Sequence, residues 1–287
     1  MSKSANEFVL TLTCPDKPGI VRDVSTFIAG NDGNIIDSAQ FGDAETRLFS
    51  MRIHFAIDAV EDVAEPLATD FAEVADRYAM TWGLHDYSKP ARVLIMVSRF
   101  DHCLADLLYR QRMGELKIEV PAVVSNHRDT YKLVAQHDIP FFHLPVTADT
   151  KAQQEQKLLE LIAQENVDFV VLARYMQILT PELCDTLRGR VINIHHSFLP
   201  GFKGARPYHQ AHSRGVKLIG ATAHYATADL DEGPIIEQDV TRVTHAQTAD
   251  ELVAVGREIE TRVLSRAVRY QSEYRIMLNG NKTVVFS

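Results

Sequence analysis

The sequence predicts an α/β protein with two domains, a small split βαβ module followed by a larger, mainly parallel, doubly wound sheet. The chain has 287 residues, a length that favours two domains over one. Its first part shows strand and helix patterns in the order strand-helix-strand-strand-helix-strand, which is typical of the split βαβ fold. After a short polar linker that contains Pro90, strands alternate with helices, and this alternation predicts a parallel sheet.

Side-chain periodicity defines the elements of the front module. Alternating residues rich in β-formers predict strands at Phe8–Cys14, Asn34–Phe41, Leu48–Ile57 and Met80–His85. Apolar residues at helical spacing predict helices from Ile20 to Gly30 and from Val63 to Tyr78.

The same criteria define the larger domain. Strands are predicted at Arg92–Ser98, Glu119–Ser125, Phe141–His143, Phe169–Ala173, Val191–His195, Ile219–Tyr225 and Ile235–Val240. Helices are predicted at Leu104–Met113, Tyr131–His137, Ala152–Glu165 and Pro181–Leu187. A long amphipathic helix follows, and its apolar face is formed by Leu252, Val255, Ile259, Val263 and Ala267.

Composition and charge exclude several classes of protein. Apolar residues make up 46% and charged residues 24%, as in an average globular protein. No apolar run approaches the roughly 18 residues of a membrane-spanning helix, and no signal-peptide segment opens the chain, so we expect no membrane association. Three widely spaced cysteines suit the reducing cytoplasm. Residues 1–88 carry 6 Lys and Arg against 15 Asp and Glu, a charge that disfavours nucleic acid as a partner.

Three polar residues near predicted strand ends form a candidate catalytic group. Asn193 and His195 have the same parity in the strand Val191–His195, so their side chains point to the same side. Asp231 follows another strand through a short loop, and ligands of open α/β sheets bind beyond the carboxyl ends of strands. An amide, an imidazole and a carboxylate together suit attack of water or an amine on a carbonyl. Taken singly, each residue is more typical of a turn, a packed interior or a loop.

Metal and nucleotide motifs are absent from the sequence. Of the 12 histidines, five lie between 195 and 224, but no cysteine lies nearby and no His-Glu-x-x-His occurs. No glycine-rich nucleotide fingerprint is present, and Ser197 does not belong to a Gly-x-Ser-x-Gly elbow. We therefore expect neither a metal nor a bound cofactor.

The front module resembles an ACT domain, a ferredoxin-like regulatory fold. The resemblance rests on Cys14-Pro-Asp-Lys-Pro-Gly-Ile-Val21 and on Gly33-Asn-Ile-Ile-Asp37. It implies that a free amino acid binds near Gly19, Ile20 and Asn34, between paired copies in a homo-oligomer. Gly19 permits a tight turn into a helix whose N-terminal amides can hold a carboxylate. The alternative is that the glycines only shape turns and that the sheet pairs with a second subunit.

Residues 90–287 resemble the formyltransferase fold, a Rossmann-like fold that uses 10-formyltetrahydrofolate. The matching strings are Asp168-Phe-Val-Val-Leu-Ala173, Met176-Gln-Ile-Leu-Thr-Pro181, the run from Asn193 to Gly204, and His224 with Asp231-x-Gly233-x-Ile235-Ile236. The resemblance implies that the catalytic residues are Asn193, His195 and Asp231. It implies that the folate is bound by Gln177, Ile178, Leu179, His224, Tyr225, Ala226 and Asp229, and Arg174 is a candidate for holding the glutamate tail.

The domain order and several strings resemble the formyltetrahydrofolate deformylase family. These strings include Ser98-Arg-Phe-Asp-His-Cys-Leu104 and Asn193-Ile-His-His-Ser-Phe-Leu-Pro200. The resemblance implies an ACT-like regulatory domain at 1–86, a linker at 87–91 and a formyltransferase-fold catalytic domain at 92–287. It also implies hydrolysis of 10-formyltetrahydrofolate to formate and tetrahydrofolate, which supplies formate for purine biosynthesis and balances the one-carbon pool.

Two other functions are alternatives at this point. Purine transformylases of this fold carry a Gly-Ser-rich loop after the first strand of the domain, and its backbone cradles the phosphate of the amine acceptor. Here Ser98-Arg-Phe-Asp-His102 contains no glycine, which favours water as the acceptor. Folate-dependent formyl transfer to an amine is one alternative. A catalytically inactive amino-acid sensor is the other, although the intact catalytic group favours an enzyme.

Overall fold

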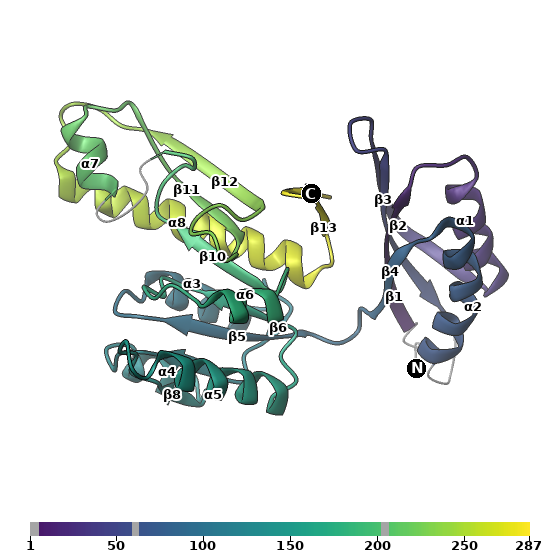
Figure 1. Ribbon diagram of the computed structural model, residues 1–287, viewed down its shortest axis with the longest axis horizontal. Helices are drawn as coiled ribbons and strands as arrows, with labels where there is room; N and C mark the ends of the chain where they lie inside the picture. Colours follow the sequence, from purple (N-terminus) through teal and green to yellow (C-terminus); the bar gives the residue numbers. More distant parts are fainter. Residues whose placement is uncertain (1–5, 59–62, 202–206) are drawn as a thin grey trace. The chain divides into compact units, whose positions relative to one another are not determined.

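In the computed structural model, which describes residues 6–58, 63–201 and 207–287, a four-stranded antiparallel sheet carries two helices in the front module (Figure 1). Its strands are β1 (Asn6–Pro15), β2 (Gly33–Asp43), β3 (Leu48–Ile57) and β4 (Thr81–Asp86), in the order β2-β3-β1-β4. The helices are α1 (Ile20–Gly30) and α2 (Ala64–Tyr78). This arrangement confirms the predicted ferredoxin-like βαββαβ fold.

Both helices cover the same face of this sheet, because alternate residues of β1 and β3 are apolar. Leu10 and Leu12 of β1 pack with Ile53 and Phe55 of β3 in one core cluster, which also contains Phe71 of α2. The apolar period of two in the strands and the helical spacing in α1 and α2 therefore converge on one core.

The opposite face of the sheet is covered by the end of the chain. Residues 273–279 and 283–287, which include β13 (Ile276–Asn279) and most of β14 (Lys282–Val285), form one compact unit with residues 1–90. Arg52 of β3 is 1% exposed there, donates from Nε to the carbonyl of Glu273 at 3.0 Å and pairs with Asp37 at 2.9 Å. The ring of Tyr274 stacks on His85 at 3.9 Å. The sequence-based division placed this segment in the second domain; long-range contacts hold it on the first.

The candidate regulatory residues occupy three different environments in this module. Gly19 precedes α1 with φ +98°, and a Cβ there would lie 3.1 Å from the hydroxyl of Tyr78. The side chain of Ile20 is buried in the core, whereas Asn34 is exposed on β2. A ligand in this region would therefore meet Gly19 and Asn34 but not the Ile20 side chain.

The second unit contains residues 91–272 with 280–282 and is built on a mainly parallel sheet. Its strands are β5 (Ala91–Val97), β6 (Ile118–Glu119), β7 (Val123–Ser125), β8 (Phe141–His143), β9 (Phe169–Leu172), β10 (Val191–His195), β11 (Leu218–Tyr225) and β12 (Ile235–Arg242). Its helices are α3 (His102–Arg112), α4 (Tyr131–Ala135), α5 (Lys151–Gln164), α6 (Pro181–Thr186), α7 (Pro207–Ser213) and α8 (Ala249–Ser272). The doubly wound domain of the prediction is confirmed.

The strand order β12-β11-β10-β9-β5-β7-β8 places a topological switch point between β5 and β9. The chain continues from β5 to β7 and β8 on one side, then crosses to β9 and β10 on the other, and all five strands are parallel. Crevices at the carboxyl ends of such strands are where doubly wound sheets bind ligands. A ligand site is therefore expected at the segments that follow β5, β9 and β10.

Three local details differ from the prediction. The expected strand Glu119–Ser125 is split into β6 and β7, because Pro121 between them has no N–H to donate to a neighbouring strand. Helix α7 and the hairpin β13–β14 were not predicted. The end of the matched run from Asn193 to Gly204, which contains Lys203, lies outside the described residues, as does Arg206.

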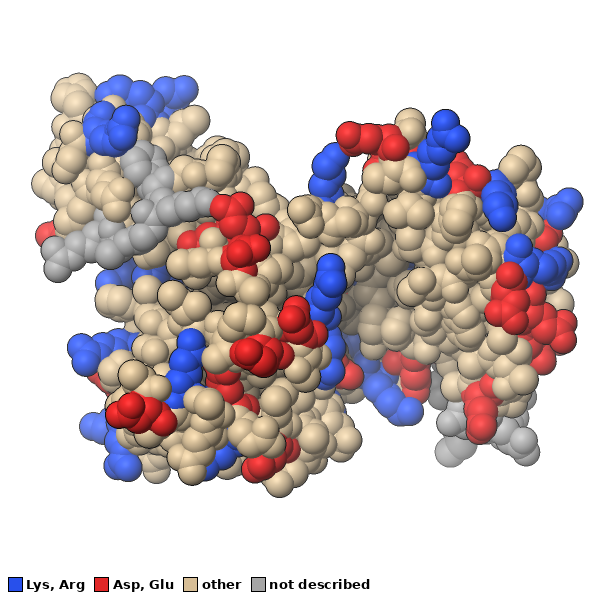
Figure 2. All heavy atoms as spheres, in the orientation of Figure 1, with Lys and Arg blue, Asp and Glu red and all other residues tan. Residues whose placement is uncertain are grey.

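On the face drawn in Figure 2, acidic and basic side chains are interspersed over both units. Among the described residues, no helix is both long enough and apolar enough to cross a membrane.

Candidate active site

The register of two neighbouring strands brings the first polar pair together. Strand β10 runs antiparallel to β11, and Asn193 lies directly opposite His224. Directly opposed residues project from the same face of a sheet. The amide nitrogen of Asn193 consequently lies 3.1 Å from Nε2 of His224, while Nδ1 of His224 lies 2.9 Å from the carbonyl oxygen of Tyr225.

Asp231 joins this pair from the loop between β11 and β12. Its Oδ1 lies 3.1 Å from Nδ1 of His195 and 3.7 Å from Nε2 of His224. The side chain of Asp231 is 7% exposed, and burial by itself raises the pKa of a carboxyl group. Hydrogen bonds and positive charge from His195 and His224 outweigh burial, so the pKa of Asp231 lies well below its ordinary value. The structure thus brings Asn193, His195 and Asp231 to one place.

The second nitrogen of His195 is also engaged. Its Nε2 lies 2.8 Å from the hydroxyl of Ser197, and that hydroxyl donates to the carbonyl of Gly201 at 2.7 Å. Since the Ser197 proton points to Gly201, the hydroxyl accepts from Nε2. With Asp231 as the acceptor at Nδ1, both nitrogens of His195 face acceptors, and this pattern suits the protonated imidazolium.

Two backbone features deliver Asp231 to the histidines. Asp231 itself has φ +60°, a left-handed conformation that few side chains other than Asn and Asp adopt readily. At Gly233 a Cβ would lie only 1.8 Å from the carbonyl oxygen of Tyr225, so only glycine permits this approach of the loop to the end of β11. The Asp-x-Gly string therefore has a steric basis.

These side chains line a cavity of about 260 Å³ at the carboxyl ends of β9 and β10. Its walls come from Arg174–Leu179 after β9, from Asn193–His196, and from the segment that contains His224 and Asp231. Among the predicted substrate-binding residues, those that line it are Gln177, Ile178, Leu179, His224 and Ala226. Wall residues that the sequence analysis did not single out include Met176, Thr227 and Leu230.

Comparison with known proteins places this cavity in a family context. Residues 91–268 match the formyl transferase family model. The formyltetrahydrofolate deformylase of Corynebacterium sp. (strain P-1) is 50% identical over 277 residues, which cover 96% of this chain and 97% of that protein. The crystal structure of a formyltetrahydrofolate deformylase from Burkholderia mallei is 51% identical with a TM-score of 0.94, and covers 98% of this chain and 100% of that one. The chain belongs to the formyltetrahydrofolate deformylase family.

The similarity to transformylases is confined to part of the chain. Glycinamide ribonucleotide transformylase 1 from Symbiobacterium toebii is 28% identical with a TM-score of 0.66, and covers 71% of this chain and 97% of that one. The predicted membership of the deformylase family is thus confirmed by matches over nearly the full length.

Two predicted substrate-binding residues have side chains outside the cavity wall. Tyr225 follows His224 in β11, and successive strand residues face opposite sides of a sheet. The hydroxyl of Tyr225 accordingly donates to Gln271 of α8. Asp229 is exposed, and its carbonyl accepts a hydrogen bond from the hydroxyl of Thr227 at 2.9 Å. Neither residue is among those that line the cavity.

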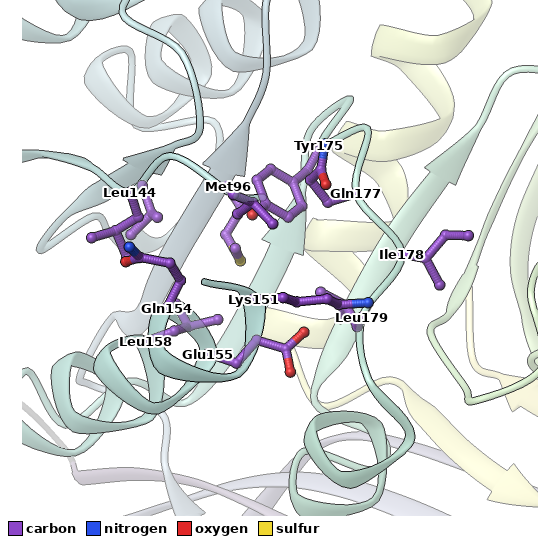
Figure 3. Close-up of a pocket in the computed structure, with 12 residues that line it drawn as sticks. Met96, Leu144, Lys151, Gln154, Glu155, Leu158, Tyr175, Gln177, Ile178 and Leu179 are labelled. Carbon is purple, nitrogen blue, oxygen red and sulfur yellow. The ribbon is translucent and has the colours of Figure 1, made fainter. Parts of the chain in front are cut away.

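The wall that follows β9 is anchored at both ends. The amide of Met176 donates to the Ser98 hydroxyl at 2.9 Å, and that hydroxyl donates to Asn126 at 2.7 Å. At the other end, Glu155 of α5 accepts from the amide and hydroxyl of Thr180. Figure 3 shows Glu155, Gln177 and Leu179 around a small crevice of about 10 Å³ that adjoins this wall. The segment Arg174–Leu179 is therefore a fixed wall.

Arg174, a candidate for holding a glutamate tail, has another partner. Its Nη1 lies 3.2 Å from Oε2 of Glu260, and its side chain is 10% exposed. Within the described part of the chain, His102, Cys103 and Glu260 form a group with ligand atoms within 4.8 Å of one another. Because Glu260 already faces the guanidinium of Arg174, this group is ill suited to a metal cation.

We expect Asp231→Asn to weaken the folded state only where the wild-type carboxylate is ionised. The folded-state pKa lies below the value of about 3.9 in an unfolded chain, so the stabilisation is complete above that pH and is lost in more acidic buffer. Urea denaturation should show a difference in unfolding free energy that persists down to about pH 4.5 and shrinks below it. Glu232→Gln, at the exposed neighbouring position, serves as the control. A difference that has vanished at pH 4.5 would contradict the lowered pKa.

Proposed function

We propose that this chain hydrolyses 10-formyltetrahydrofolate to formate and tetrahydrofolate at the cavity beside Asn193, His195 and Asp231. The observation that carries the proposal is the meeting of these three side chains in one cavity, in a chain of the deformylase family. The folate is a substrate here and not a resident cofactor. The enzyme is accordingly a hydrolase that cleaves the bond between the formyl carbon and N10.

Hydrolysis starts with a water molecule beside Asp231. Both imidazoles contact Oδ1, so among the described residues Oδ2 is the oxygen that remains to accept a hydrogen bond from water. As the water oxygen bonds to the formyl carbon, its proton moves to the carboxylate and negative charge collects on the formyl oxygen. The Asn193 amide and the protonated His195 stabilise that charge. The C–N bond then breaks, N10 takes up the proton, and formate leaves.

The lowered pKa of Asp231 defines its part in this scheme. The carboxylate is ionised at every working pH, so it is always ready to orient water. A carboxylate stabilised as an anion is also a weak base, and it therefore passes the proton on to N10 rather than retaining it.

The pterin binds between the two walls of the cavity. Ile178 is 58% exposed and Leu230 is 55% exposed, although both are apolar and both line the cavity. A flat heterocycle between the segment Gln177–Leu179 and the segment from His224 to Asp231 would cover them. Backbone groups of that second segment, Tyr225 and Asp229 included, can read the edge of the pterin.

The loop after β5 favours water over an amine as the acceptor. Its Ser98 hydroxyl is engaged by Met176 and Asn126, and the ring of Phe100 has the guanidinium groups of Arg174 and Arg257 each at 5.6 Å. By the resemblance to purine transformylases, this loop corresponds to the glycine-rich loop whose backbone amides hold a phosphate. An acceptor with a phosphate group therefore finds no backbone cradle there.

We propose that the reaction takes place in a reducing compartment in which formate is also consumed. Cys14, Cys103 and Cys184 are buried free thiols, which suits the cytoplasm. Formate released there would supply purine biosynthesis, and the tetrahydrofolate would return to the one-carbon pool.

Replacing the catalytic group should abolish most turnover without unfolding the protein. We expect losses in kcat of about 10²–10⁴-fold for Asp231→Asn, which removes the base, and about 10²–10³-fold for Asn193→Ala, which removes an oxyanion donor. His195→Ala should lose at least as much, because it removes a donor and the partner of Asp231. The measurement is formate release from 10-formyltetrahydrofolate in buffer, with Glu232→Gln as the control. Near-wild-type turnover of Asp231→Asn would refute the assignment.

The same assay separates hydrolysis from transfer. Addition of glycinamide ribonucleotide should leave the rate of tetrahydrofolate release unchanged if water is the acceptor. A rate that depends on the added amine would favour the transferase alternative.

We further propose that the front module pairs with a second copy of the chain through β2. This strand lies at the edge of its sheet, is 11 residues long and is mostly exposed. Its apolar residues Ile35, Ile36 and Phe41 are 39%, 51% and 47% exposed. An exposed apolar edge strand is a template for pairing, and a two-fold axis would bring two copies of β2 together.

A charge on this edge should therefore dissociate the oligomer. Light scattering should show the wild type as a dimer or larger, and Ile36→Lys as a smaller species with unchanged helix content. Arg47→Lys, in the turn between β2 and β3, is the control. A monomeric wild type at micromolar concentration would contradict the pairing.

We propose that this module binds a small amino acid near Gly19 and Asn34. The N-terminal amides of α1 begin directly after Gly19 and can receive a carboxylate. Calorimetric titration with glycine, serine and methionine should give heat with at least one of them and a change in deformylation rate. Gly19→Ala should abolish the heat, because φ +98° and the nearby Tyr78 hydroxyl oppose a side chain there. If none of the three amino acids gives heat, the module acts in pairing alone.

A further inference from the structure

A carboxylate outside the catalytic group lies buried against Arg174, a residue of the cavity wall. Glu260 is 1% exposed in the middle of α8, on a buried helix face whose other residues carry no charge. A buried carboxylate without partners is unstable, so it is retained only where other groups compensate it. Ile259 and Val263 on the same helix belong to the apolar face predicted from the sequence, and that pattern does not single out this acid.

Glu260 connects α8 to three other elements. The hydroxyl of Tyr208 in α7 donates to Oε1 at 2.8 Å. Nε2 of His102 in α3 lies 2.8 Å from Oε2, and Nη1 of Arg174 after β9 lies 3.2 Å from the same oxygen. Burial alone raises the pKa of Glu260, but these three partners outweigh it and keep the group ionised.

Arg174 occupies a backbone conformation that is unfavourable for its residue type. Its φ is +64°, in the left-handed region that is unfavourable for a residue other than glycine. Its carbonyl accepts from the amide of Ser98 at 3.3 Å, and the cavity wall Met176–Leu179 begins just after it. A strained arginine at the start of this wall therefore has its side chain fixed by Glu260.

A glycine in α8 makes room for the other partner. At Gly256 a Cβ would lie 2.1 Å from Cζ of Tyr208, so the tyrosine ring rests directly on the helix. Glycine inside a helix is destabilising relative to alanine, so this position favours contact with the tyrosine over helix propensity. One turn further along, Glu260 receives the hydroxyl. The ring of Tyr208 also stands edge-on to His196 at 6.4 Å, and His196 stands edge-on to His195 at 5.2 Å.

We propose that Glu260 is a positioning residue of the hydrolytic site. Through Arg174 it fixes the cavity wall Met176–Leu179, and through Tyr208 it fixes the His195–His196 segment. The proposal rests on the proposed function of the cavity. Glu260 does not itself line the cavity and takes no part in proton transfer. The contacts of Glu260 with Arg174 and with Tyr208 act on different parts of the site, so they should affect different kinetic constants. Loss of the Arg174 contact should affect folate binding, and loss of the Tyr208 contact should affect turnover.

Charge within this group also affects His196. Burial, followed by the positive charge of Arg174, lowers the pKa of His196 to about 3. The imidazole of His196 is therefore neutral at working pH, and its contact with His195 is one of ring packing.

The test compares Glu260→Gln with variants of Tyr208 and Arg174, and it measures formate release from 10-formyltetrahydrofolate. Glu260→Gln keeps the size of the side chain and an acceptor for Tyr208 but leaves Arg174 without its counter-charge. We expect KM to rise about tenfold with a smaller fall in kcat, since misplacement by about 1 Å can cost up to 10²-fold. Tyr208→Phe should lower kcat several-fold and leave KM unchanged. Arg174→Met should raise KM, and adding Glu260→Gln to it should cost little more.

The control is Arg262→Gln on the same helix, where Arg262 forms a surface ion pair with Asp239 at 2.7 Å. Its kcat and KM should match those of the wild type. Wild-type kcat and KM in folded Glu260→Gln would overturn the proposal. Should that variant not fold, unchanged kcat in Tyr208→Phe would overturn it instead.

Calorimetric binding of tetrahydrofolate separates this inference from the proposed function. A wild type that binds tetrahydrofolate but releases no formate refutes hydrolysis. In that case a roughly tenfold weaker affinity of Glu260→Gln for tetrahydrofolate still supports the positioning of the cavity wall Met176–Leu179. An unchanged affinity overturns it.

Discussion

The arrangement of the second unit depends on keeping one carboxylate ionised where little water reaches it. The side chain of Asp231 is 7% exposed, and an isolated carboxylate in such a place would be protonated or would destabilise the fold. The compensation comes from His195 and His224, which stand on neighbouring strands and contact the same oxygen. Strands β10 and β11 must therefore be adjacent, antiparallel and in a register that sets Asn193 opposite His224. A shift by one residue would turn His195 and Asn193 to the other side of the sheet.

The turns around the site follow from the same requirement. After His195 the chain turns away from β10 while the imidazole keeps its place. The hydroxyl of Ser197 holds this turn, because it accepts a hydrogen bond from Nε2 of His195 and donates one to the carbonyl of Gly201. Thr222 of β11 then fixes this turn, because its hydroxyl donates to the carbonyl of Ser197 at 2.9 Å and accepts from the amide of Leu199 at 3.1 Å. On the opposite side, the close approach that Gly233 permits brings Asp231 back over the end of β11. The site is thus held by the hydroxyl groups of Ser197 and Thr222, which bond to backbone groups, and by the close approach at Gly233.

Local patterns in the sequence were sufficient for the features that depend on local physics. Alternation and helical spacing predicted strand Val191–His195 and most of the elements in both units, although not α7 or the hairpin β13–β14, and strand parity placed Asn193 and His195 on one side. Parity could also have shown that the Tyr225 side chain faces away from His224. Features that depend on distant partners were missed. Nothing near the chain end predicts that Tyr274 will stack on His85, and nothing in the segment that follows β9 predicts that Arg174 will meet Glu260. Glu260 does fall on the buried stripe of its helix, but a carboxylate there can be interpreted only when its partners are known.

The two buried carboxylates Asp231 and Glu260 differ in where they lie relative to the cavity, and this difference separates chemistry from support. Asp231 lines the cavity together with His195 and His224, so it can contact a water molecule that enters. Glu260 does not line the cavity, and its partners are the guanidinium of Arg174, which does not release its proton, a tyrosine whose pKa burial raises further, and His102 of α3. A proton held by Glu260 or His102 therefore does not reach the water that attacks the substrate. The Glu260 cluster holds its neighbours in place, whereas the geometry around Asp231 can transfer a proton between water and a leaving nitrogen.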